Sequence, residues 1–325
     1  MMVDRDFPTF SMVIEWENAV LSELDRTREM LGELHQQLGE VVERGYPRPE
    51  IIILHDKDDA EPRLVEEVVA KVAPLAAWPA EVRIIAAEGL EYVEQKNFGA
   101  KQSDSDLIFF LDSDVIPEPG WLAGLLEAFR DPEVQVVGGN TYISPEGFFG
   151  KAFALFWFFP MRDEGSGLRR ADGFWANNVA FRREIFEAFP FPDMPTFRVQ
   201  VTALKQELRK QGVGVFLQQG SRVSHPAPNG LSHFVARAIC QGSDSVAIRS
   251  HSEKGDGSLP GTVKLYVRSL GRSLKNIARH HRDVKLSPVG AVGAFGVAAG
   301  YQTLQFAGAL VTHARPELIR RRFSI

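Results

Sequence analysis

Cysteine is nearly absent from this chain of 325 residues, in which Cys240 is the single one. One cysteine excludes an intrachain disulfide and any zinc site built from cysteines, so a reducing compartment is the simplest expectation. The first ten residues also lack the apolar stretch of an N-terminal secretion signal. These two absences predict that the catalytic part of the protein lies in the cytoplasm.

The chain also lacks a strong charge of either sign. Its formal net charge is -5, which gives no reason to expect a nucleic-acid partner. Hydrophobic residues make up 44% of the chain, enough for a sizeable core. The length therefore suits one large α/β domain, or a domain with an appendage.

The most informative stretch runs from Leu107 to Pro117, where five apolar residues lead into two carboxylates, Asp112 and Asp114. An apolar run without polar interruption predicts a strand buried on both faces, as in the middle of a mostly parallel sheet. Because side chains at i and i+2 of an extended segment point the same way, both carboxylates are expected beyond the strand's carboxyl end. Such oxygen ligands suit Mg²⁺ or Mn²⁺, whereas the alternative is an ordinary solvated turn.

Strands and helices alternate on either side of this stretch. Apolar runs predict strands over 10–14, 50–54, 82–85 and 134–139, and other segments, 20–42, 61–72 and 92–101, are predicted to be helical. This order predicts a doubly wound α/β unit that binds its ligand at the carboxyl edge of the sheet. The acidic turn with Asp56 follows the second strand and belongs to the same edge. Lys96 is expected either to contact a phosphate or base there, or to lie on a solvated helix face.

Composition changes after Gly147, because residues 148–159 hold six phenylalanines and one tryptophan. Such density fits a core helix, a wall of an acceptor pocket or a membrane-facing patch. Further on, Asn177 and Asn178 interrupt an apolar, strand-like run. Since buried amides need hydrogen-bond partners, this pair predicts either structural bonding to a loop or a contact with substrate.

The order of these motifs resembles that of family 2 glycosyltransferases with the GT-A fold. The resemblance covers roughly residues 8–228 and rests on the first strand, the acidic turn, Gln95–Ala100, the run ending at Asp114, and Ala176–Phe186. It implies a Rossmann-like α/β fold with a doubly wound, mixed sheet. It also implies transfer of a sugar, with inversion, from a nucleotide-diphosphate donor to an acceptor.

Site residues are carried over from the resemblance position by position. Asp112 and Asp114 match the family's metal and donor motif, and His225 matches a late histidine that completes the metal or diphosphate site in many GT-A enzymes. Nucleotide contacts are implied for Glu15, Asp56, Lys96 and Asp112, and acceptor contacts for Trp175, Asn177 and Asn178. The implied cofactors are Mg²⁺ or Mn²⁺ and a nucleotide sugar, a UDP-sugar first among them, and the implied acceptor is a glycan or a lipid-linked molecule.

The general base is where the chain departs from the family. An acceptor hydroxyl needs a carboxylate base within hydrogen-bond reach. The family takes it from an acidic pair before a helix that ends Leu-Arg-x-x-Gly. Here that helix spans 203–212, but the pair's positions hold Gln200 and Val201.

Three interpretations of this departure stay open. The alignment is shifted, with Glu207 or Asp193 as the base; the base is relocated, for example to Asp172; or the protein binds a nucleotide sugar without turning it over. We expect a relocated base, Asp172 or Asp193, because the donor motifs are intact. The alternative function is a catalytically impaired nucleotide-sugar-binding protein.

Two other enzyme classes are less consistent with the motifs. A nucleotidyltransferase needs a Gly-rich, basic phosphate loop after the first strand, where this chain has the acidic segment Glu15–Asn18. A processive polysaccharide synthase is expected to carry a Gln-x-x-Arg-Trp run and several membrane spans, and neither is present.

The C-terminal third raises the question of a membrane. Seven basic residues alternate with apolar ones over 263–285, which predicts a basic amphipathic helix or, alternatively, a solvated helix packed on the catalytic domain. The segment 286–314 holds no Asp, Glu, Lys or Arg and is long enough to cross a bilayer, but it contains Gln302 and Gln305. It also contains Gly296-x-x-x-Gly300, a close-packing pattern.

Positive charge on both flanks of 286–314 favours a re-entrant or in-plane hairpin over a crossing. We therefore expect a transferase domain over 1–230 and a C-terminal helical region over 231–325. Attachment is expected to be peripheral or monotopic, at the inner face of a membrane. A single spanning helix and a soluble helix pair are the alternatives, and a homo-oligomer is left open.

Overall fold

The computed structural model describes residues 7–21, 24–56, 62–194, 196–251 and 255–323. The chain divides into two compact units, which are described separately. The first comprises 1–141, 163–192 and 204–224, and the second 142–162, 193–203 and 225–325. The chain thus enters the second unit for the last time at residue 225.

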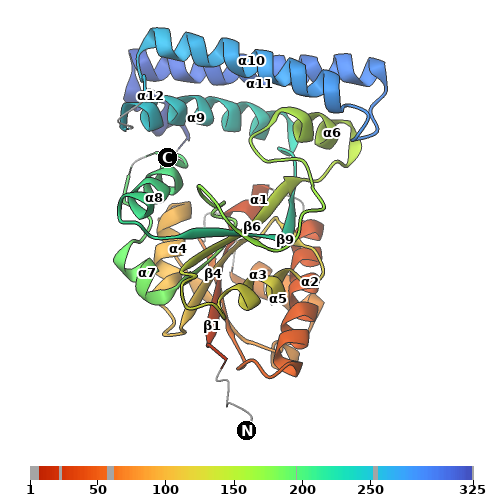
Figure 1. The fold of residues 1–325 in the computed structure, drawn as a ribbon, viewed down its shortest axis with the longest axis vertical. Helices are drawn as coiled ribbons and strands as arrows, with labels where there is room; N and C mark the ends of the chain where they lie inside the picture. The colour runs from red at the N-terminus through yellow and green to blue at the C-terminus, as the bar shows by residue number, and fades with distance from the viewer. Residues whose placement is uncertain (1–6, 22–23, 57–61, 195, 252–254, 324–325) are drawn as a thin grey trace. The chain divides into compact units, whose positions relative to one another are not determined.

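A mixed sheet forms the centre of the first unit (Figure 1). Across the sheet the strand order is β3-β2-β1-β4-β8-β6-β9-β5, and β7 pairs with β9. Strands β1 to β4 pair in parallel, whereas β8 runs antiparallel to both β4 and β6. The strands are β1 (Phe10–Glu15), β2 (Glu50–His55), β3 (Glu81–Ala86), β4 (Leu107–Asp112), β5 (Ile116–Pro117), β6 (Val136–Ile143), β7 (Leu168–Arg170), β8 (Asn178–Arg182) and β9 (Val215–His225). The predicted doubly wound, mixed sheet is confirmed.

Helices cover both faces of this sheet (Figure 1). Alternate residues of a strand point to opposite faces, and because β1 and β4 are apolar throughout, both faces present apolar side chains. On one face Met12 and Phe109 join a core with α2, α3 and α5. The helices that lie wholly in the first unit are α1 (Glu17–Leu21), α2 (Leu24–Glu43), α3 (Pro62–Val72), the 3-10 turn η1 (Leu75–Ala77), α4 (Tyr92–Ala100), α5 (Trp121–Ala128) and α7 (Arg183–Ala188), whereas α8 (Val199–Lys210) begins in the second unit and ends in the first.

The opposite face is covered by α4 and α7. Phe110 packs there against Phe186 and Phe191, with ring centroids 4.8 and 5.6 Å apart. Gly99 lets α4 approach closely, because a β-carbon at this position would lie 2.5 Å from a Val13 methyl and 2.8 Å from a Leu54 methyl. This close approach holds α4 against β1 and β2.

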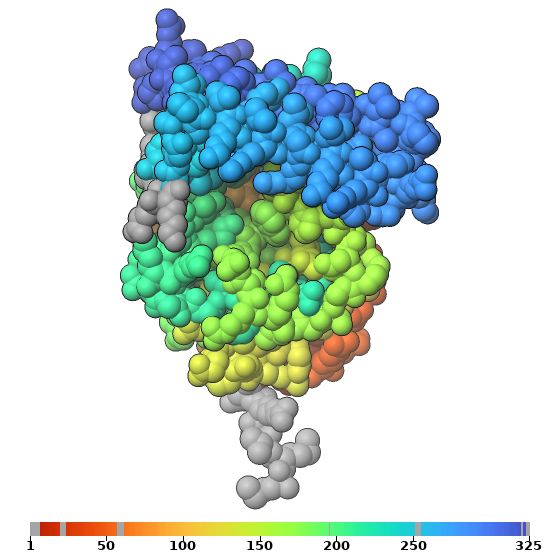
Figure 2. All heavy atoms as spheres, turned by 45° about the horizontal axis from the view of Figure 1, so that its top comes forward, coloured from red at the N-terminus to blue at the C-terminus, as the bar shows by residue number. Residues whose placement is uncertain are grey.

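The second unit is mainly helical. Its helices are α6 (Gly147–Phe156), α9 (Gly230–His251), α10 (Leu259–His280), α11 (Pro288–Ala314) and α12 (Pro316–Phe323). The starts of α10 and α11 are encoded locally, since Ser258 and Ser287 accept hydrogen bonds from Gly261 and Gly290 and a proline follows each cap. α10 and α11 lie side by side (Figures 1 and 2).

The segment 286–314 differs from its prediction. It contains one uninterrupted helix, α11, rather than a re-entrant or in-plane hairpin. Its Gly296 and Gly300 face open space, so the predicted close-packing pattern is not used. Backbones approach instead at Gly242 of α9 and Gly308 of α11, where a β-carbon would collide with the Gln305 and Ile239 carbonyl oxygens.

Within the described part of the chain, none of the helices, α11 included, is both long enough and apolar enough to cross a membrane.

Candidate functional site

The carboxyl ends of three parallel strands bring predicted site residues to one edge of the sheet. Glu15 closes β1 and is the register partner of Asp112, which closes β4. Asp56 directly follows β2, and Leu54 of β2 pairs with Glu15. Ligands of open α/β sheets bind outside this edge, so the three carboxyl groups define the candidate site.

Asp112 is held by three side chains inside the protein. The Lys96 ammonium donates to its Oδ1 at 2.7 Å, and the Tyr92 hydroxyl lies 2.9 Å from both carboxylate oxygens. Asn18 Nδ2 donates to Oδ2 at 3.2 Å. Lys96 is fully buried, so it does not lie on the solvated helix face that was the alternative for it, and its predicted contact with a phosphate or base stays a prediction. Tyr92 and Lys96 stand one helical turn apart, a spacing that sequence reasoning missed.

Glu15 is the second buried carboxyl group at this edge. Asn18 donates to it twice, from Nδ2 at 2.6 Å and from its backbone N–H at 3.2 Å. Burial raises the pKa of Glu15 well above its ordinary value, and the negative charge of Asp112 raises it further, while the positive charge of Lys96 lowers it. Two carboxyl groups beside one ammonium therefore favour a protonated Glu15.

Asp114 lies in a turn rather than in an extension of the strand. β4 ends at Asp112 and residues 113–114 turn, so the extended backbone predicted to align the two carboxylates is wrong. Arg26 of α2 holds this turn: its Nε donates to the Asp114 carbonyl at 2.6 Å. Its Nη2 donates to the Ser224 carbonyl at 2.7 Å and to the Ser224 hydroxyl at 2.9 Å. No local sequence signal pointed to Arg26, which lies 88 residues before Asp114.

The side chains available as metal ligands favour a metal ion that is held jointly by the protein and a substrate. Among the described residues, no group of three or more His, Cys, Asp or Glu side chains forms a metal cluster. The Asp112 carboxylate is already neutralised by Lys96. Mg²⁺ and similar ions are commonly bound through one or two carboxylates together with substrate phosphates. Asp114 fits that role.

Asp56 organises the loop after β3. Its Oδ2 accepts a hydrogen bond from the Gly89 backbone N–H at 2.5 Å, and its side chain is buried. Positive φ at Gly89 permits this turn. The remainder of the acidic turn, residues 57–59, lies outside the described residues.

The two predicted asparagines hold strands together. Asn178 is fully buried, accepts from Trp121 Nε1 at 2.8 Å and donates to the Asn140 and Ser221 carbonyls. Asn177 accepts from the Thr141 hydroxyl at 2.9 Å. The geometry of Asn178 favours the structural alternative, because both ends of its amide already have protein partners.

Trp175 is accompanied by a lysine that sequence reasoning missed. Lys205 Nζ lies 5.4 Å from the centre of the Trp175 ring and donates to the Phe174 carbonyl at 3.2 Å. Burial lowers the pKa of Lys205. An aromatic ring beside an amino group is a surface that suits a sugar's apolar face and hydroxyls.

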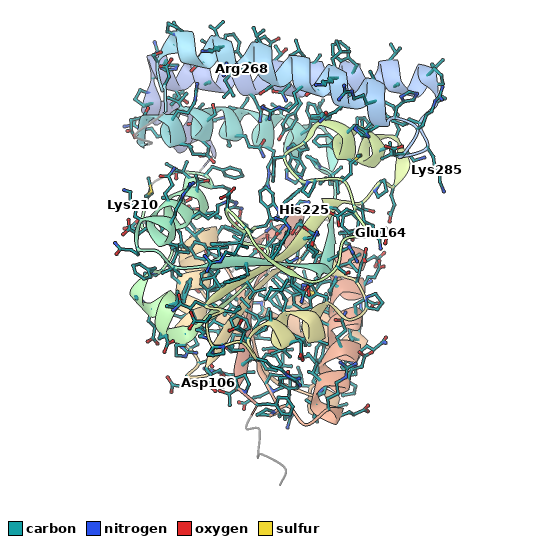
Figure 3. The ribbon with its side chains drawn as sticks, in the orientation of Figure 1. Asp106, Glu164, Lys210, His225, Arg268 and Lys285 are labelled. Carbon is teal, nitrogen blue, oxygen red and sulfur yellow. The ribbon has the colours of Figure 1, made fainter. Side chains whose placement is uncertain are left out.

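His225 closes β9 and belongs to the second unit (Figure 3). Its Nδ1 lies 2.6 Å from the Pro226 carbonyl, and its ring packs 4.9 Å from that of Phe159. When Nδ1 donates to this carbonyl, the tautomer places the lone pair on Nε2, as metal-binding histidines require. His225 follows Ser224, the residue through which Arg26 ties β9 to the Asp114 turn.

The candidate bases occupy different parts of the fold. Asp172 is exposed in the first unit, after β7, and Asp193 is exposed in the second, after α7. Gln200 is buried and donates to the Met194 and Thr196 carbonyls, at 2.7 Å each, so it stabilises the start of α8. Glu207 accepts from Gln211 at 2.7 Å.

A hollow at the opposite, amino-terminal edge of the sheet is less suited to a ligand. It is lined by charged residues that include Arg182, Arg183 and Asp106, the last of which is labelled in Figure 3. Asp106 accepts from the backbone and the hydroxyl of Thr9, and both arginines donate to backbone carbonyls. Because these groups are bonded within the protein, the carboxyl edge remains the candidate site.

Comparison with known proteins agrees with this geometry. A similar solved structure is that of the mannosyltransferase PcManGT from Pyrobaculum calidifontis in complex with GDP-Man and Mn²⁺; the TM-score is 0.56 at 15% sequence identity, over 95% of this chain and 88% of that one. This likeness confirms the GT-A fold. No curated protein matches the chain. The model of the family "Glycosyl transferase family 2" matches residues 22–189, more than half of the chain. The chain therefore belongs to glycosyl transferase family 2 and is a glycosyltransferase.

Proposed function

We propose that the protein is a metal-dependent, inverting glycosyltransferase. It moves a sugar from a nucleotide-diphosphate donor to a glycan or glycolipid acceptor at the cytoplasmic face of a membrane. The observation that carries the proposal is the placement of Asp112, Asp114 and Glu15 at the carboxyl edge of a sheet in a family 2 chain. The structural neighbour, whose title names GDP-Man and Mn²⁺, supports a nucleoside diphosphate sugar and a divalent ion.

The nucleobase is left open between uracil and guanine. The resemblance led us to expect a UDP-sugar, whereas the neighbour's title names GDP-Man. Asp56 is the nearest described group of the acidic turn, and its Oδ2 already accepts from Gly89. Because the neighbour's title names GDP-Man, GDP-mannose is the first donor to test, and UDP-sugars are tested in parallel.

Asp114 is the proposed protein ligand of Mg²⁺ or Mn²⁺, with His225 as a further ligand. The bound ion supplies positive charge against the diphosphate that leaves. Lys96 and Tyr92 hold Asp112 in one orientation, so this carboxylate is ordered before the donor arrives. Arg26 holds the Asp114 turn through the backbone carbonyl of Asp114.

The base that removes the acceptor proton is proposed to be Asp172 or Asp193. Both are exposed, as a group that meets an incoming acceptor must be, whereas Gln200 is buried and unable to accept a proton as a base. Trp175 with Lys205 provides an acceptor surface in the first unit, and Asn177 borders the same stretch of chain. The acceptor oxygen then attacks the anomeric carbon while the bond to the diphosphate breaks.

Donor binding is tested by thermal shift with GDP-mannose and with UDP- and TDP-sugars, each with and without Mn²⁺. A bound donor raises the melting temperature by mass action, and we expect the shift to need Mn²⁺. Asp114→Asn is expected to abolish the metal-dependent part without lowering the melting temperature of the free protein. Absence of a metal-dependent shift for every sugar nucleotide would contradict the donor site.

The base is tested by comparing transfer rates of three variants, Asp172→Asn, Asp193→Asn and Glu207→Gln. Loss of a general base lowers kcat by about 10²- to 10⁴-fold while donor binding persists. We expect this loss in one of the two aspartate variants and none in Glu207→Gln, whose side chain is paired with Gln211.

A second candidate function is a nucleotide-sugar-binding protein without turnover. It is favoured by Gln200, whose buried amide is used structurally where the family carries an acid. Donor hydrolysis or transfer by the wild type, abolished in Asp114→Asn, would exclude it.

Peripheral attachment to the inner face of a membrane is proposed to occur through the second unit. The support is α10, a helix whose exposed side chains include five basic residues and no acidic ones. Such a surface is attracted to anionic lipid headgroups.

A further inference from the structure

Exposed apolar side chains are concentrated in the second unit. Of the 15 exposed large hydrophobic residues among those described, 12 belong to it and only Leu64, Leu75 and Leu168 to the first unit. Single exposed apolar residues are ordinary, but a concentration of them marks an interaction surface.

Four of these residues form one patch, here called the α6–α11 tip: Phe148, Phe149, Val289 and Val292. Val289, Val292 and Gly293 share a face of α11, since they are spaced three and four residues apart. The Phe148 ring lies over Gly293, where a β-carbon would be 3.0 Å from it, and it packs 5.5 Å from the Phe149 ring. The patch is therefore continuous, although its halves are about 140 residues apart in the sequence.

The tip is well exposed to solvent. The exposed fractions are 58% for Phe149, 82% for Val289 and 73% for Val292. Phe153 of α6, by contrast, is buried against Trp157 and Tyr301. One aromatic-rich segment thus supplies both a core and an exposed apolar patch.

A row of basic residues lies on α10, the helix that packs against both α6 and α11. Successive residues of an α-helix are rotated by about 100° around its axis, and on this basis the side chains of α10 fall into three separate sectors. Thr262, Ser273 and Ile277 are buried; an exposed apolar row follows around the helix; and an exposed basic row comes next. The apolar row is Leu259, Val263, Val267 and Leu274, and the basic row is Lys264, Arg268, Arg272, Lys275 and Arg279. Figure 3 labels Arg268 on α10 and Lys285 in the turn between α10 and α11.

Lys285, in the turn that leads into the tip, has an unfavourable backbone conformation. Its φ is 56°, and it is the one described non-glycine residue with a positive φ. It occupies the position after α10 where glycine is the usual choice, because Leu286 N–H bonds back to the His281 carbonyl. Lysine at this position places a positive charge four residues before Val289, although a positive φ costs a non-glycine residue conformational energy.

We propose that the α6–α11 tip inserts among the acyl chains of an anionic lipid surface while the basic row of α10 contacts the lipid phosphates. This inference rests on the membrane attachment in the proposed function and names the inserting residues and the lipid charge. The alternative occupant of the tip, a second copy of the chain, brings a second basic helix toward the first. Like charges at such an interface oppose association, whereas anionic lipid neutralises them.

Binding of the full chain to vesicles of phosphatidylcholine, with or without phosphatidylglycerol, tests the proposal. We expect binding to need phosphatidylglycerol. Phe149→Ser/Val289→Ser is expected to weaken it at least tenfold, and Arg268→Gln/Arg272→Gln/Lys275→Gln by roughly fivefold per charge. The matched control, Leu64→Ser/Leu75→Ser in the first unit, is expected to bind as the wild type does.

Insertion is measured directly with an environment-sensitive fluorophore on Val289→Cys. Burial raises the pKa of Cys240 to about 12, so this thiol does not compete for the label. A blue shift with anionic vesicles, absent for a label on Leu64→Cys, supports insertion. Wild-type vesicle binding by the tip variant, or a wild-type dimer that the tip variant dissociates, would overturn the proposal.

Failure of this proposal is distinguishable from failure of the transferase assignment. The metal-dependent thermal shift with a donor sugar nucleotide reports on the candidate site, and we expect it to be unchanged in the tip and basic-row variants. A variant whose own melting temperature falls is replaced by Val292→Ser, which changes one exposed side chain.

Discussion

Lys96 Nζ lies 2.7 Å from Asp112 Oδ1, and both side chains are buried, with exposed fractions of 0% and 6%. The first carboxylate of the Asp-Ser-Asp motif therefore carries its own counter-ion, supplied by the helix behind the sheet. This pairing assigns the two aspartates different tasks. Asp112 is part of the folded frame of the site, and Asp114, on the turn beyond, is the carboxylate proposed to meet a metal ion.

Replacement of Lys96 by methionine should destabilise the protein by about 3–5 kcal/mol, because it leaves the Asp112 charge buried without its partner. Lys96→Met/Asp112→Asn should recover part of this loss, since the uncompensated charge is gone. Urea unfolding measures both effects. Lys71→Met, at an exposed position on α3, is the control and should change stability by less than about 0.5 kcal/mol. A small effect of Lys96→Met would show that the pair is solvated.

Glu15 should make the stability of the protein fall as pH rises. Its pKa is higher in the folded than in the unfolded protein, so the folded state binds more protons between these two pKa values. The free energy of unfolding then decreases with pH from the ordinary carboxyl range up to the folded pKa. Glu15→Gln should remove this contribution and keep the bond from Asn18. The comparison is urea unfolding from mildly acidic to neutral pH, with exposed Glu66→Gln as a control that keeps the wild-type slope.

Arg26→Ala should weaken binding of Mn²⁺ with a nucleoside diphosphate by about 10- to 100-fold, the range seen when groups that orient metal ligands are removed. The physical reason is the loss of the bonds that hold the Asp114 turn against Ser224. Mn²⁺ titration followed by thermal shift measures the effect. Arg28→Ala is the matched control, because Arg28 pairs with exposed Asp25 on the same helix. Equal metal affinity in the two variants would refute a positioning role for Arg26.

Alanine substitutions should distinguish glycines of the second unit that allow close helix packing from glycines that only lower helix stability. Gly242→Ala and Gly308→Ala should each destabilise this unit by about 1–3 kcal/mol, because the new methyl group meets a carbonyl of the facing helix. Gly296→Ala and Gly300→Ala face open space and should stabilise α11 by up to about 1 kcal/mol. Thermal unfolding followed by circular dichroism gives both signs. Stabilisation in all four variants would show that α9 and α11 are not tightly packed.

Much of the fold was predictable because it is encoded locally. Apolar runs such as Leu107–Leu111 specify buried strands, and the prolines and serines at 258–260 and 287–288 specify helix starts. The placement of Glu15, Asp56 and Asp112 at one edge followed from strand order alone, since parallel strands end together. The sequence by itself thus determined the α/β class, the strand alternation and the edge at which the candidate site lies.

Contacts between distant segments decided the rest. Nothing near Lys96 in the sequence says that its ammonium is buried on Asp112 rather than solvated, and nothing near Asp114 points to Arg26. The turn at 113–114 depends on β5 pairing with β9, about 100 residues later. Likewise, the exposed tip exists only because Phe148 packs on Gly293. Local sequence patterns indicate which backbone conformations are low in energy. The partners of buried charges, the close contacts at glycines and the exposed patches depend instead on which surfaces the tertiary fold brings together.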